Sequence, residues 1–226
     1  MIKKRTLLSW SSGKDSAWTL YQLQQDPGIE LAGLVTTINQ THQRVAMHAV
    51  RVALLEQQAQ AAQLPLHIIN IPHPCSNVMY QQAMDDFFQR IQGQGVTHMA
   101  FGDLYLDDVR QYRVDNLKHT GLEPLFPLWL KPTKALAQEM LAAGLKTRIT
   151  CVDPKQLAAS FAGREFDQTF LDELPEGVDP CGENGEFHSF AYAGPMFKHP
   201  IAIMLGETVE REGFVFTDLK PGSTPT

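Results

Sequence analysis

Residues 6–22 read TLLSWSSGKDSAWTLYQ and join two different patterns of hydrophobic spacing. Residues 6–10 form a short apolar run that is typical of a buried strand. From Ser16 onward, Ala17, Leu20 and Tyr21 recur at the i, i+3, i+4 spacing of a helix. Between them lies a loop that contains one glycine. The stretch therefore predicts a strand, a tight loop and a helix in direct succession.

The same alternation continues to about residue 120. Further strands are expected at 31–38, 66–71 and 98–101, with helices at 48–63, 76–92 and around 107–120. A parallel connection needs a crossover of this length to return along the sheet. The pattern predicts an α/β fold, a doubly wound, Rossmann-like parallel sheet that binds ligands beyond the carboxyl ends of its strands.

A second, smaller unit is expected after this sheet. Residues 123–132 read EPLFPLWLKP, with three prolines and no helical period, and they place a domain boundary near residue 130. This divides the chain into domains 1–130 and 131–226. The second is predicted to be α+β, and its tail, 221–226, to be disordered. Its expected elements are helices at 134–143 and 167–174 and strands at 147–152, 201–210 and 214–219.

Composition and cysteine content narrow the class of protein. Hydrophobic residues make up 43% of the chain and charged residues 19%, which is ordinary for a globular protein and excludes disordered and collagenous classes. No apolar run approaches the roughly 18 residues of a membrane helix, and no signal-peptide stretch follows the basic N-terminus. Cys75, Cys151 and Cys181 are too few for a disulfide framework and predict reduced thiols in a cytoplasmic protein.

The distribution of charge bears on partners. The net charge is −6, and residues 114–226 hold 16 acidic against 10 basic residues, whereas residues 1–113 hold nine of each. A general nucleic-acid surface needs a basic face. General nucleic-acid binding is therefore not expected, although a local basic groove stays open.

The loop of residues 11–16, SSGKDS, has the makeup of an anion site. It lies between the first strand and the first helix, where backbone N–H groups and the helix dipole attract phosphate. It matches neither the Walker pattern GxxxxGK[ST] nor the GxGxxG loop. The alternative is a turn in which Asp15 and Ser16 cap the helix. The position after the first strand favours phosphate binding.

This loop resembles the SGGxDS pyrophosphate loop of N-type ATP pyrophosphatases, in the adenine nucleotide α-hydrolase superfamily of HUP-type folds. Ser12 stands where the motif has a glycine, and Gly13 is expected to keep the tight turn. The resemblance implies ATP as cofactor, held by Ser11, Ser12, Gly13, Lys14, Asp15 and Ser16. It also implies Mg²⁺, for which Asp15 and Asp103 are the candidate ligands.

Further blocks are similar to the diphthine–ammonia ligase family in its short two-domain form. They are FGDL at 101–104, YRV at 112–114, PLW at 127–129, CGENGEFHS at 181–189 and AGPMF at 193–197. The resemblance implies an ATP-dependent, AMP-forming ligase that adenylates a carboxylate, releases pyrophosphate and then aminates the acid with ammonia. The family's acid is diphthine, a modified histidine on elongation factor 2. For this chain, the acid is left open between a small molecule and a protein-borne group, and the oligomeric state between monomer and homo-oligomer.

The same resemblance assigns roles to the turn at 181–189. Glu183 and Glu186 each follow a glycine, Gly182 and Gly185, in a tight loop, and they would bind ammonium and accept its proton. Composition alone favours a solvated turn. Glu183 and Glu186 complete the expected catalytic set with Lys14 and Asp15.

Several other side chains are candidates for binding. Adenine in the superfamily lies near the ends of the first two strands, which points to Trp10, Thr36 and Thr37, although strand propensity also explains the threonines. The remaining candidates could contact substrate phosphate or carboxylate, and the alternative for each is a purely structural role as a surface or core residue. They are His48, Arg51, Asp103, Arg110, Arg113 and His188.

Two other functions stay open. A tRNA-thiolating ATP pyrophosphatase would share the loop but needs reactive cysteines and a basic surface for the tRNA. A non-catalytic ATP-binding module would keep ATP intact, but the chain carries more acids and bases near the expected site than binding requires.

Overall fold

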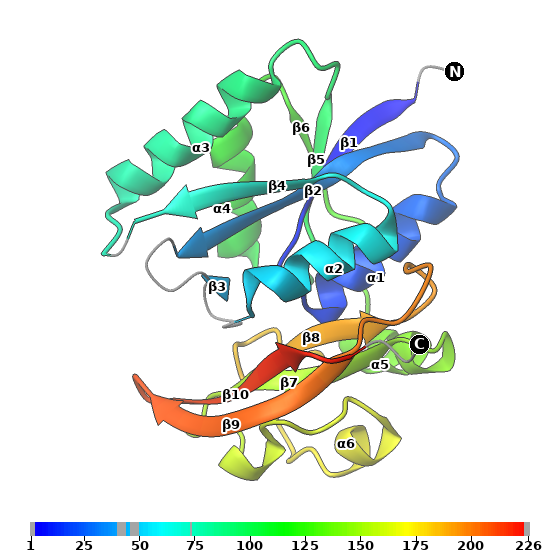
Figure 1. Cartoon of the computed structure of the whole chain (residues 1–226). Helices are drawn as coiled ribbons and strands as arrows, with labels where there is room; N and C mark the ends of the chain where they lie inside the picture. Colours follow the sequence, from blue (N-terminus) through cyan, green and yellow to red (C-terminus); the bar gives the residue numbers. More distant parts are fainter. Residues whose placement is uncertain (1–2, 40–43, 46–49, 73, 224–226) are drawn as a thin grey trace.

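A computed structural model describes residues 3–39, 44–45, 50–72 and 74–223. It contains two sheets, one above the other in Figure 1, with helices on and between them. No helix within these ranges is long and apolar enough to cross a membrane.

The first sheet has five parallel strands in the order β4-β2-β1-β5-β6. They are β1 (Lys4–Ser9), β2 (Ile29–Asn39), β4 (Leu66–Ile71), β5 (His98–Ala100) and β6 (Glu123–Leu125). A two-residue strand, β3 (Arg44–Val45), pairs antiparallel with the end of β2. The chain runs outward through β1, β2 and β4 and then returns to place β5 on the other side of β1. This topological switch lies between β1 and β5, where sheets of this class open a ligand crevice. The expected parallel α/β sheet is confirmed.

Four helices cover the two faces of this sheet: α1 (Lys14–Gln25), α2 (Val52–Ala62), α3 (Asn77–Ile91) and α4 (Asp107–Leu117). Figure 1 shows α1 and α2 below the sheet and α3 and α4 on its other face. Each face of the sheet packs against its helices in a separate hydrophobic core, and the strands contribute to both cores because successive side chains point to opposite faces. Leu7 and Val35 pack with α3, whereas Leu8 and Leu34 pack with α1 and α2.

The second sheet is antiparallel, in the order β8-β7-β10-β9. Its strands are β7 (Lys146–Val152), β8 (Phe187–Ala193), β9 (Ile203–Arg211) and β10 (Phe214–Pro221), with helices α5 (Thr133–Ala142) and α6 (Gln168–Asp172) and a short 3₁₀ turn, η1 (Ala159–Phe161). Phe166, Phe170 and Phe187 fill the space around α6. This core is continuous with that of α1 and α2. The second sheet therefore packs under the first sheet's helices rather than apart from them (Figure 1).

Helix starts and prolines account for the differences from expectation. Helix α1 begins at Lys14 after an extended Gly13, so Asp15 and Ser16 lie inside the first turn, and the alternative in which they cap the helix is wrong. Helix α2 begins at Val52, because Arg51 is extended. Strand β6 was not expected, since it contains Pro124, which an edge strand tolerates. Pro221 belongs to β10 and pairs with Ile203, so the expected disorder at that residue is also wrong.

Candidate functional site

Two adjoining chambers open at the carboxyl ends of β1 and β5. The apolar chamber, of about 260 Å³, is lined from β1, β2, β4, α3 and α4. The polar chamber, of about 280 Å³, is lined by loop 11–16, by residues that follow β5 and by residues 182–189 of the second unit. Five residues line both chambers, so the two chambers share a wall, and together we call them the cleft. The shared residues are Ser9, Ser11, Phe101, Arg113 and His188.

The left-handed residue of the loop is Ser12, not the glycine. Ser12 has φ 72°, whereas Gly13 is extended with φ −84° and ψ 178°. The Ser12 side chain is buried, and its Oγ has no hydrogen-bond partner in the part of the chain that the structure describes. Its carbonyl accepts hydrogen bonds from Ala191 N at 2.9 Å and Gln58 Nε2 at 3.0 Å. The serine thus takes a left-handed conformation, which glycine enters freely, and its carbonyl is held from α2 and β8.

Lys14 joins the loop to the second unit. Its side chain is 3% exposed, and its Nζ donates to Asp15 Oδ2 at 2.8 Å and to the carbonyl oxygen of Cys181. Its backbone N–H donates to Ser189 Oγ at 3.1 Å. Burial alone would lower the pKa of Lys14, but the charge of Asp15 and the hydrogen bond to it help raise that pKa above its ordinary value. A fixed positive charge therefore lies at the wall of the polar chamber.

Asp15 and Asp103 both line the polar chamber. Burial raises the pKa of each carboxyl, opposed by Lys14 at Asp15 and by Arg113 at Asp103. Asp15 Oδ1 accepts no hydrogen bond from the described residues, and Asp103 Oδ2 lies a long 3.5 Å from Arg113 Nε. The unpartnered oxygen of Asp15 and the loosely paired oxygen of Asp103 fit Mg²⁺, which prefers oxygen ligands and keeps waters and phosphates in its shell. Within the described ranges no three His, Cys, Asp or Glu residues group as a complete metal site, so substrate oxygens and water would have to complete it.

The two acids of the 181–189 turn face different surroundings. Glu183 lines the polar chamber, and its Oε1 accepts hydrogen bonds from the N–H of Leu104 at 2.8 Å and Tyr105 at 3.4 Å. Burial raises the pKa of Glu183 to about 7, although the Leu104 N–H acts in the opposite direction.

Glu186 is 1% exposed and lines neither chamber. Its Oε1 accepts hydrogen bonds from Asp179 N at 2.9 Å and Asn184 Nδ2 at 3.0 Å, which close the turn on itself. The structure therefore places the Glu183 side chain in the cleft, whereas the Glu186 side chain is buried inside the second unit.

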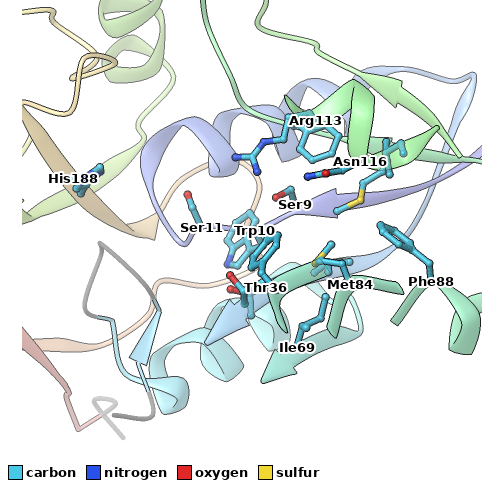
Figure 2. Close-up of a pocket in the computed structure, with 16 residues that line it drawn as sticks. Ser9, Trp10, Ser11, Thr36, Ile69, Met84, Phe88, Arg113, Asn116 and His188 are labelled. Atoms are coloured by element: carbon cyan, nitrogen blue, oxygen red, sulfur yellow. The ribbon is translucent and has the colours of Figure 1, made fainter. Parts of the chain in front are cut away.

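The apolar chamber gathers the residues expected near adenine. Trp10 is buried and donates from Nε1 to Gln58 Oε1 at 2.8 Å. Thr36 and Thr37 also line the chamber, and the Thr36 Oγ1, on a residue 3% exposed, has no partner among the described residues. Figure 2 shows Trp10, which follows β1, next to Thr36 of β2, with Met84 and then Phe88 of α3 to their right.

The expected basic residues separate into two groups. Arg113 lines both chambers and stacks over Phe101 at 5.3 Å. Arg51 instead donates from Nε and Nη2 to the two carboxylate oxygens of Asp218 in β10, at 3.2 and 2.6 Å, and lines neither chamber.

Arg110 is exposed and stacks over Trp129 at 4.8 Å, also outside the chambers. His48 lies outside the described residues. His188 reaches the cleft from β8 of the second sheet. Of the expected basic and histidine contacts, the structure therefore brings Arg113 and His188 to the cleft and leaves Arg51 and Arg110 away from it.

Three residues of the cleft or its supports were missed in the sequence. Tyr80 and Asn116 line the apolar chamber from α3 and α4, and no spacing in the sequence marks them. Gln58 is fully buried beside Leu54, Leu55 and Ala62. A glutamine on the apolar stripe of a helix was the one signal that could have identified it.

The comparisons with known proteins cover both units. The family model of the diphthamide synthase N-terminal domain matches residues 4–123, and that of the diphthamide synthase C-terminal domain matches residues 132–222. The diphthine–ammonia ligase of Bos taurus is 27% identical over 91% of this chain and 85% of its own length, and that of Homo sapiens is 27% identical over 88% and 82%. The diphthine–ammonia ligase of Danio rerio is 37% identical, over 46% of this chain and 43% of its own, less than half of either.

Proposed function

Because the chain belongs to the diphthamide synthase family, we propose that it is an ATP-dependent ligase that adenylates a carboxylate and then converts it to an amide with ammonia. The relatives named diphthine–ammonia ligase support the ligase class. One observation supports this chemistry most strongly: residues of loop 11–16 and Glu183 line the same polar chamber, which lies next to an apolar chamber.

The two chambers suit the two parts of ATP. The apolar chamber would take the adenosine, with Trp10 in its wall and the free Thr36 hydroxyl available to the base or the ribose. The triphosphate would lie over loop 11–16, at the start of α1, where backbone N–H groups and the helix dipole favour anions. Asp15 and Asp103 would hold Mg²⁺, which when bound neutralises phosphate charge.

The residues of the polar chamber then serve two half-reactions. In the first, a carboxylate oxygen forms a bond to the α-phosphorus while the bond to the β-phosphate breaks, and Lys14 with the loop N–H groups stabilises the departing pyrophosphate. In the second, ammonia attacks the acyl carbon and AMP leaves. Glu183 accepts the proton of the ammonium ion to supply that ammonia. Arg113, which reaches both chambers, would bind the incoming carboxylate.

The relatives are named after diphthine, and this name guides our proposal for the acid that is amidated. We propose diphthine or a similar acid, carried on a small molecule or a protein, as the group that this chain amidates in the cytoplasm. The acidic second half makes nucleic acid a poor partner. Product analysis tests the proposal. AMP and pyrophosphate that depend on acid and ammonium support it, ADP with orthophosphate overturns it, and intact bound ATP would indicate a binding module.

The tRNA-thiolating alternative gains no support from the two buried cysteines, Cys151 and Cys181. Burial raises the pKa of the Cys151 thiol to about 12 and also raises that of Cys181. Neither lines a chamber, and Cys181 Sγ donates to Thr133 O. Sulfur transfer needs an accessible thiolate, which these two residues do not provide.

Gly102 gives a test of the close packing behind the loop. A Cβ on Gly102 would lie 3.1 Å from the backbone carbon of Asp15 and from Thr19 Oγ1. We expect Gly102→Ala to push the first turn of α1, destabilise the fold by about 1–3 kcal/mol, and weaken ATP binding in calorimetry.

Gly28→Ala is the matched control, because its added methyl meets only the movable side-chain oxygen of Asp26. Equal ATP affinity in both variants and wild type would show that the loop does not depend on this contact.

A further inference from the structure

Gln58 of α2 is completely buried, and both its amide oxygen and its amide nitrogen make hydrogen bonds. Its Oε1 accepts from Trp10 Nε1 at 2.8 Å, and its Nε2 donates to Ser12 O at 3.0 Å and to Ala191 O at 2.6 Å. The indole nitrogen can only donate and the two carbonyls can only accept, so the amide has one possible orientation. One side chain thereby connects the wall of the apolar chamber, the loop and β8.

The hydrogen bond from Gln58 to the Ser12 carbonyl fixes the orientation of the peptide group between Ser12 and Gly13. The Ser12 carbonyl receives two donors, from Gln58 and Ala191, and in a trans peptide the next N–H points the opposite way. That N–H belongs to Gly13 and makes a long, weak contact of 3.4 Å with Ser11 Oγ. Gly13 itself lines neither chamber, but its N–H is directed at Ser11, which lines both, so a phosphate oxygen that displaces this hydroxyl could accept the N–H in its place.

Ser12 also needs this support for its own conformation. A residue with a side chain is strained at φ 72°, a region that glycine enters freely. The bonds from α2 and β8 to its carbonyl oppose relaxation of the loop to an ordinary backbone angle. A glycine at position 12 would depend less on them.

We propose that Gln58 is a positioning residue for the nucleotide: it holds Ser12 in the left-handed conformation, so that the Gly13 N–H faces the phosphates. The inference rests on the proposed ATP site. It assigns to α2, which contributes no lining residue to the polar chamber, control over the geometry of the loop.

The test replaces Gln58 by methionine, which is of similar size but makes none of the three hydrogen bonds. Gln58→Met is expected to raise the Kd for ATP·Mg²⁺ in calorimetry, and the KM for ATP, about tenfold, a loss of the order expected when hydrogen bonds are removed. The kcat at saturating ATP should change much less. Gln60→Met, at an exposed position of the same helix, is the control and should bind as wild type.

A second substitution separates positioning from general damage to the core. Ser12→Gly should restore most of the affinity lost in Gln58→Met, so that the Kd of the double variant lies close to that of Ser12→Gly alone, because a glycine at position 12 no longer needs to be held. Equal affinity in Gln58→Met and wild type, or no rescue by Ser12→Gly, overturns the inference. Wild type that fails to bind ATP overturns the proposed function instead.

A measurement on wild type keeps the test decisive if Gln58→Met does not fold. Addition of ATP·Mg²⁺ should slow hydrogen exchange at the Gln58 side-chain amide and the Trp10 indole N–H, both observable by NMR. Bound nucleotide that leaves both exchange rates unchanged contradicts the proposal.

Discussion

Replacement of Glu183 by glutamine is expected to lower the rate of amide formation by at least a hundredfold, at the low end of what a general base contributes. Glutamine can still accept the N–H groups of Leu104 and Tyr105, so the turn should keep its place. It cannot take a proton from ammonium. The rate of amide formation at saturating ATP and limiting ammonium measures the loss, and calorimetry should show ATP affinity close to wild type.

The pKa of Glu183 gives this prediction a pH dependence. Because burial raises that pKa from its ordinary 4.5 to about 7, the folded protein binds this proton more tightly than the unfolded chain. The wild type should therefore lose stability as pH rises through this window, while amide formation increases as Glu183 ionises. Glu183→Gln should remove that loss, so its Tm at pH 8 should equal or exceed that of wild type. Wild-type amide formation in the variant would remove Glu183 from the reaction.

Glu186→Gln is the matched comparison three residues away. Glutamine keeps an acceptor for Asp179 N and Asn184 Nδ2, in a place that faces neither chamber. We expect amide formation to persist, with any loss appearing in Tm. If Glu186→Gln abolished the reaction and Glu183→Gln did not, the roles of the two acids would be reversed.

The second large effect is expected at Lys14. Lys14→Met removes a buried charge that binds Asp15 and the Cys181 carbonyl, and it leaves the Asp15 carboxylate without its counter-ion. Loss of one partner of a buried pair typically costs about 3–5 kcal/mol. ATP binding should fall below detection, and Tm should fall with it. A simple loss of binding without loss of stability is therefore not expected at this residue.

A double-mutant cycle separates these two roles of Lys14. Lys14→Met combined with Asp15→Asn removes both charges, so it should recover much of the stability that Lys14→Met loses. It should not recover ATP binding, because the positive charge and the candidate metal ligand are both gone. Denaturant unfolding and calorimetry on the four proteins measure the two quantities. ATP binding restored in the double variant would show that Lys14 acts only on the fold.

Local periodicity was sufficient to predict most elements of the parallel sheet. The helix expected at 76–92 is α3 at Asn77–Ile91, and its stripe of Met84, Phe87 and Ile91 packs in the core, because residues spaced along one helix determine that face. The strand expected at 66–71 matches β4. Strand β6 was not predicted, because its pairing with β5 leaves no signal in the hydrophobic spacing of β6 itself.

The candidate site was predictable in place but not in detail. Loop 11–16 could be located, yet the left-handed angle at Ser12 is held by Gln58 and Ala191, which are distant in sequence. Glu183 and Glu186 read alike, since each follows a glycine in the same turn. Only the tertiary structure shows that one reaches Leu104 across the cleft while the other closes its own turn.

The most direct test follows one oxygen atom from acid to nucleotide. The protein would be incubated with ATP, Mg²⁺, ammonium and a diphthine-bearing peptide whose carboxylate carries oxygen-18, and the products analysed by mass spectrometry. Attack of the carboxylate on the α-phosphorus predicts AMP that contains one oxygen-18, together with pyrophosphate and the amide. Formation of the amide with unlabelled AMP, or with ADP and labelled orthophosphate, would contradict adenylation of the acid.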